Sequence, residues 1–208
     1  LNLNSVTTND DWGLAPNAVA IASTATAVGA FPLSSGSKDS AILTNLSANG
    51  YTAEVTGVSN GTGVALVEVY DTNTGADPKL VNISTRAKIT GTDNVIAGFI
   101  ITGNTGKKLL IRAAGPALSG FGISGYVTNP MVTVYAGGSP IYQNDDWGSA
   151  WNLSALNSAT SSSGAFSFGS GSTDAAMLIE LPPGTYTAIV EGVSGATGIT
   201  LVEVYVVP

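Results

Sequence analysis

Short apolar runs recur along the chain, and in several of them apolar and polar residues alternate with the period of two that is typical of β-strands. Gly, Asn, Asp or Pro bounds each run, and PPGTY and SANGY place such residues where consecutive strands must reverse. Helix signals are sparse, and only AWNLSALNSA around Ala150 could form a turn or two of helix. The pattern predicts an all-β fold, an antiparallel β-sandwich of jelly-roll-like type. The predicted strands are 41–46, 51–58, 64–71, 80–85, 95–103, 107–115, 131–137, 175–181, 186–193 and 199–207.

One stretch of the sequence occurs twice. Residues 9–70 align with residues 144–205 at a constant offset of 135 (144 − 9 = 205 − 70), without a gap and with roughly half of the residues identical. The copies share NDDWG, GAF, YTA, GVS and LVEVY. A match of this kind indicates the duplication of a structural unit.

The duplicated stretch is only part of a unit. Residues 79–142 have no counterpart earlier in the chain, and they contain four of the predicted strands. We therefore predict about one and a half units, with an incomplete β half-unit at 1–70 and a complete β-sandwich unit at 71–208. Because the half-unit lacks four strands, it would have unpaired edges and an uncovered apolar face, and open edges recruit strands from other chains.

Composition narrows the classes of function. Charged residues make up 10% of the 208 residues, the formal net charge is -7, and the seven cations are scattered, so no basic stripe could bind nucleic acid. The absence of cysteine excludes disulfides and thiolate metal sites. The apolar runs are too short to span a bilayer, and the first residues lack the basic and apolar regions of a secretion signal. We therefore expect neither membrane insertion nor a signal peptide in this sequence.

The chain carries little catalytic chemistry. Histidine and cysteine are both absent, which removes the usual triads and imidazole metal sites. Two carboxylates could serve a glycosidase, but such an enzyme also needs an aromatic-lined cleft, and Trp12, Trp147 and Trp151 belong to the repeated loops. We therefore predict that the protein is not an enzyme and has no catalytic residues.

The repeated NDDWG loops contain the candidate metal ligands. Asp10, Asp11, Asp145 and Asp146 stand beside Asn amides and turn carbonyls, the oxygen ligands that calcium prefers. The spacing is not that of an EF-hand, and Asn and Asp also close turns by bonding to the backbone while a Trp covers one end of a sandwich. We favour this structural interpretation over a calcium site, because the loop is duplicated together with its strands. No other cofactor is expected.

Two charged positions follow from the strand pattern. Glu68 and Glu203 occupy equivalent places in LVEVY, and alternation puts each on the face opposite to the flanking valines. We expect both to face solvent. A buried ion pair between a carboxylate and Lys107, Lys108 or Arg112 is a further option, and nothing in the sequence singles one out.

The motifs NISTR, GTYTA and LVEVY, together with GFIITG, KKLLIRAAGPAL and NDDWG, give the chain a family resemblance. Over nearly its whole length it resembles a repeat module of large secreted proteins of environmental bacteria. From MVTVYAGG to the end it is also similar to the bacterial pre-peptidase C-terminal domain, a small β-sandwich attached to secreted enzymes and surface proteins. The resemblance implies an extracellular, noncatalytic module and assigns no catalytic residue.

Two classes of function fit these observations. We favour a structural protein of the bacterial cell exterior, a fibre or filament subunit that forms a head-to-tail homopolymer by β-strand complementation. In that interpretation a terminal segment, LNLNSVTT or LVEVYVVP, adds as a strand to the open sheet of a neighbour. The alternative is a secreted carbohydrate-binding or accessory adhesion module, with glycans as partners.

Overall fold

The computed structural model describes residues 5–73, 75, 79–91 and 93–207. The chain divides into two compact units, Leu1–Lys79 (unit 1) and Leu80–Pro208 (unit 2). The residues between Tyr70, where we placed the boundary, and Lys79 therefore belong to unit 1.

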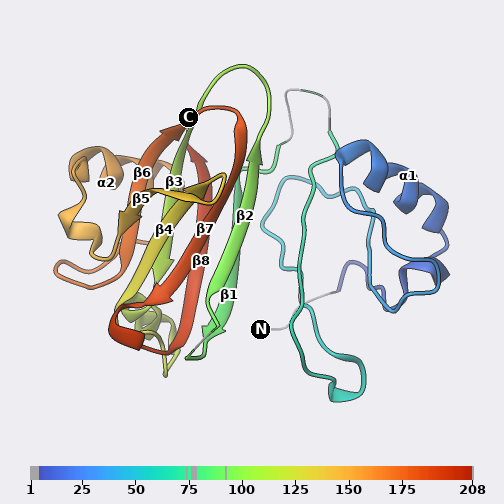
Figure 1. Ribbon diagram of the computed structural model, residues 1–208, viewed down its shortest axis with the longest axis horizontal. Coiled ribbons are helices and arrows are strands. Elements are labelled where there is room, and N and C mark those ends of the chain that lie inside the picture. Colours follow the sequence, from blue (N-terminus) through green and yellow to red (C-terminus); the bar gives the residue numbers. More distant parts are fainter. Residues whose placement is uncertain (1–4, 74, 76–78, 92, 208) are drawn as a thin grey trace. The chain divides into compact units, whose positions relative to one another are not determined.

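Unit 2 is an antiparallel β-sandwich of two four-stranded sheets, which confirms the predicted fold class (Figure 1). One sheet has the order β1-β8-β3-β6 and the other has the order β2-β7-β4-β5. The strands are β1 (Asn82–Ile89), β2 (Val95–Ile101), β3 (Lys107–Ala114), β4 (Pro130–Ala136), β5 (Ser139–Asn144), β6 (Ala175–Leu181), β7 (Gly184–Gly192) and β8 (Gly198–Val207).

The strand order is that of a rolled ribbon with two arms. The first arm holds β1 to β4 and the second arm holds β5 to β8, and the pairs are β1 with β8, β2 with β7, β3 with β6 and β4 with β5. These pairs fall alternately in the two sheets. Within one sheet β8 pairs with β3 and joins its two pairs, and within the other sheet β7 pairs with β4 and does the same. This is the double-sheet arrangement of a jelly roll. Within the second arm, no two strands pair with each other among the described residues.

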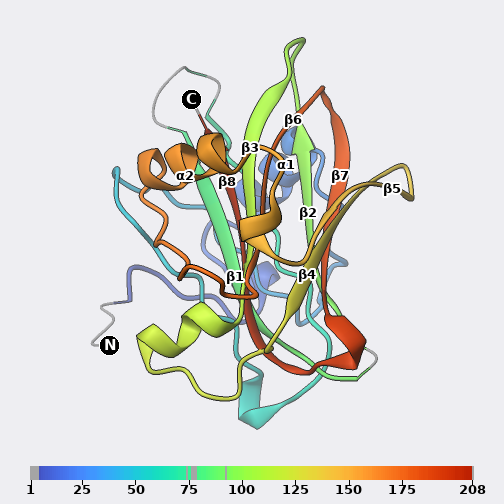
Figure 2. The same cartoon turned by 90° about the vertical axis from the view of Figure 1, so that its left-hand side faces the viewer.

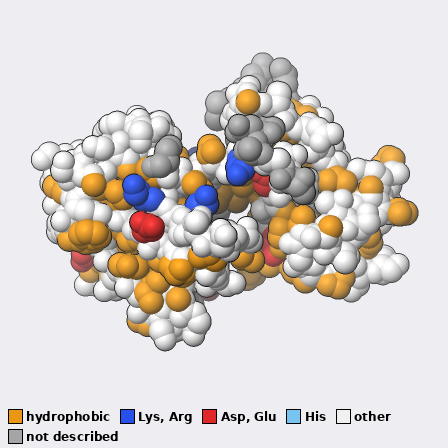
Figure 3. All heavy atoms as spheres, turned by 90° about the horizontal axis from the view of Figure 1, so that it is seen from above, with side chains coloured by type: hydrophobic (Ala, Val, Ile, Leu, Met, Phe, Trp, Pro, Cys, Tyr) orange, Lys and Arg blue, Asp and Glu red, His pale blue; other side chains and the backbone are white. Residues whose placement is uncertain are grey.

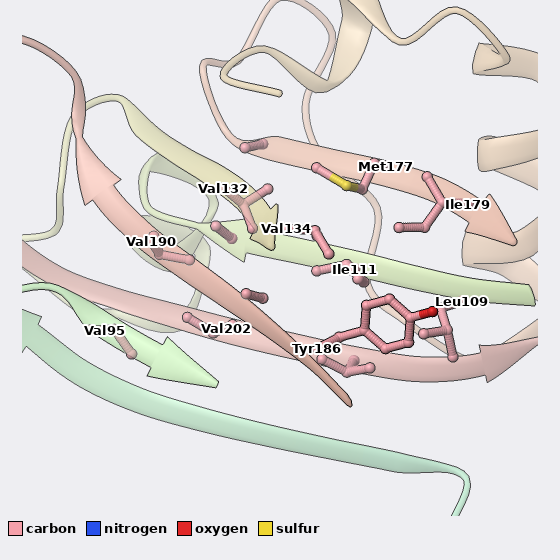
Figure 4. Packing of buried hydrophobic residues seen from close by; sticks show 14 of the residues in the cluster. Val95, Leu109, Ile111, Val132, Val134, Met177, Ile179, Tyr186, Val190 and Val202 are labelled. Carbon is pink, nitrogen blue, oxygen red and sulfur yellow. The ribbon is translucent and has the colours of Figure 1, made fainter. Parts of the chain in front are cut away.

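The core lies between the two sheets and takes alternate residues from each strand. Ile111 from β3 and Val202 from β8 meet Val134 and Val190 from the other sheet, and all four side chains are buried (Figure 4). The Tyr186 ring closes one part of this core and stacks on Phe99, with 5.6 Å between ring centroids. The apolar residues that alternate along each strand are thus buried because the two sheets face each other.

The outer face of the β1-β8-β3-β6 sheet is also partly covered. Helix α2 (Leu153–Ser162) lies against β3 and β6, as Figure 2 shows, where Leu156 and Ala159 pack on Leu110 and Leu178. This helix confirms the short helical signal near Ala150. The described residues of the unit also form the 3₁₀ helices η3 (Pro116–Phe121), η4 (Trp147–Ser149) and η5 (Val193–Gly195).

Unit 1 contains α1 (Ala18–Val28), η1 (Trp12–Leu14) and η2 (Val58–Asn60), and its described residues form no β-strand. The strands predicted at 41–46, 51–58 and 64–71 are therefore wrong for this unit. Their counterparts in unit 2 belong to the second arm and pair with the first arm, which unit 1 lacks. Helix α1 was not predicted, although its alanine-rich sequence favours a helix and Gly29 ends it in the left-handed conformation at φ +77°.

Candidate functional site

In both units the NDDWG asparagine ties its loop to a segment 32 residues further along the chain, which is β6 in unit 2 and a segment without strand structure in unit 1. In unit 2, Asn144 Oδ1 accepts a hydrogen bond from the Ala176 N–H at 2.9 Å, and its Nδ2 donates to the carbonyl two residues on at 3.0 Å. In unit 1, Asn9 Oδ1 accepts from the Ala41 N–H at 3.0 Å, and its Nδ2 donates to the equivalent carbonyl at 3.3 Å. The asparagine amide is therefore engaged in the fold twice over.

The tryptophan of the motif is held in the same way in both units. The backbone N–H of Trp147 donates to the Asp174 carbonyl at 2.8 Å, and that of Trp12 donates to the Asp39 carbonyl at 2.9 Å. Each indole N–H donates to a backbone carbonyl 22 residues further on, at 3.3 and 3.2 Å. These four bonds need no first arm, because both partners belong to the duplicated stretch.

The four aspartates of the motifs do not converge. Asp10 and Asp145 are exposed, and Asp11 Oδ2 lies 2.8 Å from Lys38 Nζ. In the part of the chain that the structure describes, no group of three or more Asp, Glu, His or Cys side chains is placed to hold a metal ion. A calcium site at Asp10, Asp11, Asp145 or Asp146 stays a prediction, and the geometry supports the structural interpretation of these loops.

Arg112 is the charged centre of unit 2. It projects from the outer face of β3, where the register places it opposite Glu203 of β8, and its Nε lies 3.3 Å from Glu203 Oε2. The guanidinium carbon lies 4.4 Å from the ring centroid of Phe166 and 4.1 Å from that of Phe168. Arg112 is 1% exposed and Glu203 is 4% exposed, so the ion pair is buried.

The prediction that Glu203 faces solvent is therefore wrong. Alternation does direct Glu203 away from the inner core, since Val202 and Val204 are the core residues on either side. The outer face at this point is covered by other parts of the fold, among them the Phe166 and Phe168 rings over Arg112. Sequence alternation identifies a face, and only the tertiary structure says whether that face meets water.

Tyr205 completes the polar cluster. Its hydroxyl donates to Glu203 Oε1 at 2.7 Å. Burial, reinforced by the hydrogen bond to the Glu203 carboxylate, raises the pKa of Tyr205 well above its ordinary value. Burial lowers the pKa of Arg112, and the negative charge of Glu203 opposes that change. Since arginine stays protonated in proteins, Glu203 balances a permanent buried charge.

Asp174 forms a second buried link between the arms. Its Oδ1 accepts hydrogen bonds from the N–H groups of Gly115 at 2.7 Å and Ala117 at 3.2 Å, and its Oδ2 accepts one from the Ser172 hydroxyl at 2.7 Å. Gly115 and Ala117 stand at the start of η3, where N–H groups lack helical partners and favour a carboxylate. The C-terminal end of β3, a first-arm strand, is thus fixed to the second arm.

A small pocket adjoins the Arg112 side chain. Its volume is about 240 Å³, and its walls include Trp147, Thr160, Ser167 and Phe168. Within the described residues, the guanidinium nitrogens make no hydrogen bond. The pocket is lined by aromatic, apolar and hydroxyl-bearing residues, while the guanidinium beside it is itself buried.

Unit 1 carries the same second-arm residues without these partners. Glu68 corresponds to Glu203, Tyr70 to Tyr205 and Asp39 to Asp174, while Arg112 has no counterpart in residues 9–70. The Tyr70 hydroxyl donates to Glu68 Oε1 at 3.2 Å, which repeats the bond between Tyr205 and Glu203. Both Glu68, as expected, and Asp39 are exposed.

The apolar face of unit 1 is exposed at positions that form the core of unit 2. Val55 is 61% exposed and Val67 is 52% exposed, whereas their counterparts Val190 and Val202 are 0% and 1% exposed. Further pairs behave in the same way: Leu46 and Leu181, Tyr51 and Tyr186, Val69 and Val204, and Ile42 and Met177. We call Ile42, Leu46, Tyr51, Val55, Val67 and Val69 the open face of unit 1. Few charged side chains interrupt the apolar and polar surface of the molecule in the view of Figure 3.

Comparison with known proteins adds little to the class defined by the strand order. No family model matches the chain, and no curated relative matches it. The chain is similar to the crystal structure of the pre-peptidase C-terminal domain of a collagenase from Bacillus anthracis, with 12% identity over 60% of this chain and 89% of that chain and a TM-score of 0.36. At that level of similarity the fold assignment rests on the strand pairing itself. In the described residues, no helix has the length and apolar character needed to cross a membrane.

Proposed function

We propose that the protein is a noncatalytic structural protein of the bacterial cell exterior. In this proposal it is a self-assembling subunit of a surface fibre or filament, and neighbouring subunits are joined head-to-tail by β-strand complementation at unit 1. The observation that carries the proposal is the open face of unit 1, whose residues repeat the core of unit 2 and yet lie exposed. A segment with strand-like apolar alternation that lies exposed and outside any sheet can recruit strands from other chains.

In this proposal the contact between subunits lies at the open face rather than at the chain termini. Residues 201–207 of the closing segment LVEVYVVP, which the sequence offered as a donor, lie in β8, and β8 pairs with β1 on one side and β3 on the other. It is therefore occupied within its own unit. In LNLNSVTT, residues 1–4 lie outside the described residues, and Ser5 to Thr8 are exposed and correspond to β5.

The proposal predicts that the full chain associates through the open face. Val55→Lys and Val67→Lys place a charge on that face and should lower the average particle mass measured by light scattering, because a buried unpaired charge is costly. Val19→Lys is the matched control, since Val19 is exposed on α1 outside the open face. Filaments of the wild-type chain should be visible by negative-stain electron microscopy. A wild-type chain that stays monomeric at high concentration would contradict the fibre subunit.

A carbohydrate-binding or adhesion module is the second candidate. It is favoured by the pocket beside Arg112, which Trp147, Thr160 and Ser167 line together. A monomeric chain in the experiment above would move this candidate into first place.

A further inference from the structure

We propose that the open face of unit 1 is the acceptor for a first arm of the same kind as residues 82–136, supplied from outside these 208 residues. The donor carries an arginine at the position of Arg112, and this arginine seats against Glu68. The inference rests on the proposed function, which places strand complementation at unit 1, and it names the donor.

Topology restricts what can fill the open face. In unit 2, β6 pairs with β3, β7 pairs with β2 and β4, and β8 pairs with β1 and β3. The strands of the second arm therefore find their backbone partners in the first arm. A single added strand could pair with only part of residues 41–70, so the donor must bring the whole set from β1 to β4.

Two polar positions of unit 1 fix the register of the donor. At the offset of 135, Glu68 faces the donor residue equivalent to Arg112, and Asp39 faces the N–H groups equivalent to those of Gly115 and Ala117. In unit 2 both links are buried and formed. Glu68 and Asp39 thus match groups that only a first arm presents, which makes the open face specific rather than merely apolar.

The local structure of the acceptor is already in place. Tyr51 donates its hydroxyl to the Ser47 carbonyl at 3.0 Å, and its counterpart Tyr186 donates to the Pro182 carbonyl at 2.9 Å. Ser59 and its counterpart Ser194 share the left-handed conformation, at φ +52° and +55°. The turns that join the second-arm segments therefore have their final geometry before any donor binds, which lowers the cost of ordering on binding.

Arm counting identifies the donor as additional to the arm in residues 82–136. These 208 residues contain two second arms and one first arm. Whichever way copies of the chain exchange their first arms, one second arm per copy remains without a first arm. A copy that donates its first arm to unit 1 of a neighbour leaves its own second arm open, so an extra first arm is needed to complete every sandwich.

The test is to extend the full chain with a copy of residues 80–135 placed directly before Leu1. Since Leu1 corresponds to Ala136, this junction keeps the register without a linker. We expect backbone amide exchange at Val55, Val67 and Val69 to slow by roughly 100-fold or more, because those amides enter a buried ladder. The extended chain should also be monomeric by light scattering.

Matched variants test the register. Arg112→Met made only in the added copy, and Glu68→Gln in the acceptor, should each reduce the protection, and combining them should add little. An added arm with the same composition in scrambled order should give no protection. Protection by the scrambled arm, or no effect of either substitution, would overturn the assignment of this donor.

A first arm fused to a soluble carrier tests a donor from another polypeptide. It should bind the full chain in a 1:1 complex and should not bind the extended chain, whose acceptor is filled. Equal binding to both would overturn the proposal. If unit 1 folds in the extended chain and the wild-type chain never self-associates, the assignment of the donor is supported and the proposed fibre is contradicted. If the wild-type chain self-associates but the amides of the extended chain gain no protection, the proposed fibre is supported and the assignment of the donor is contradicted.

Discussion

At the scale of single residues, Arg112 and Glu203 decide how the outer face of unit 2 is closed. Arg112 lies between two phenylalanine rings and beside one carboxylate, so its charge is balanced by Glu203. The sequence offered Lys107, Lys108 and Arg112 as equal candidates for a buried ion pair. The cross-strand register of β3 and β8 selects Arg112, because it alone of the three stands opposite a carboxylate on the central strand β8.

Removal of one partner should be costly. Glu203→Gln leaves the Arg112 charge buried without a counter-charge, and we expect the free energy of unfolding of unit 2 to fall by about 3–5 kcal/mol. Glu68→Gln is the matched control and should change stability by less than about 0.5 kcal/mol, since Glu68 is exposed in the unextended chain. Urea unfolding followed by near-UV circular dichroism measures both. Equal effects of the two substitutions would show that the buried pair does not stabilise unit 2.

Tyr205 should make the stability of unit 2 sensitive to alkaline pH. Its pKa is raised in the folded state, so the stability that the neutral hydroxyl contributes is complete below the ordinary pKa of 10.0. As the pH rises from there through the folded-state pKa, that contribution is lost, because the unfolded chain releases the proton first. Tyr205→Phe should weaken this decline and cost about 1 kcal/mol at neutral pH. Tyr142→Phe is the control, and an unchanged pH profile of Tyr205→Phe would contradict the prediction.

At the scale of elements, the NDDWG loop of unit 2 is hydrogen-bonded through Asn144 to the strand β6. Asn144→Ala removes the acceptor of the Ala176 N–H, and a backbone group that loses its partner in a buried place should cost about 1–3 kcal/mol of unfolding free energy. Asp145→Asn should cost less than about 0.5 kcal/mol, because Asp145 is exposed. Thermal melting with and without a calcium chelator separates the two interpretations of the loop. A melting temperature that falls in chelator, in the wild type but not in Asp145→Asn, would support calcium.

The helices and the strands show how far local pattern predicts an element. The segment around Ala150 gave a helical signal and forms α2, whereas α1 was missed although alanine fills much of its sequence. The same apolar alternation produces a strand in β8 and no strand in residues 63–70. A strand exists only where a second chain segment accepts its hydrogen bonds, and helices satisfy theirs internally.

At the scale of the whole molecule, the duplication and the number of arms present in each unit explain the two units together. Unit 2 has both arms of the ribbon and buries its core, and unit 1 has one arm and exposes the equivalent side chains. The open face is therefore a property of arm number rather than of the residues themselves, since most of the exposed positions are identical in the two copies.

The sequence by itself determined the fold class, the duplication, the offset of 135 and the extent of the missing segment, because period and identity are local and can be read without contacts. It also placed Glu203 on the correct strand and the motif aspartates in the correct loops. Only the tertiary structure decided that Glu203 is buried against Arg112 and that Asp174 holds the start of η3. Those links join residues 59 to 91 positions apart in the chain (174 − 115 = 59; 203 − 112 = 91), and their energy depends on register and on exclusion of water, neither of which a local pattern contains.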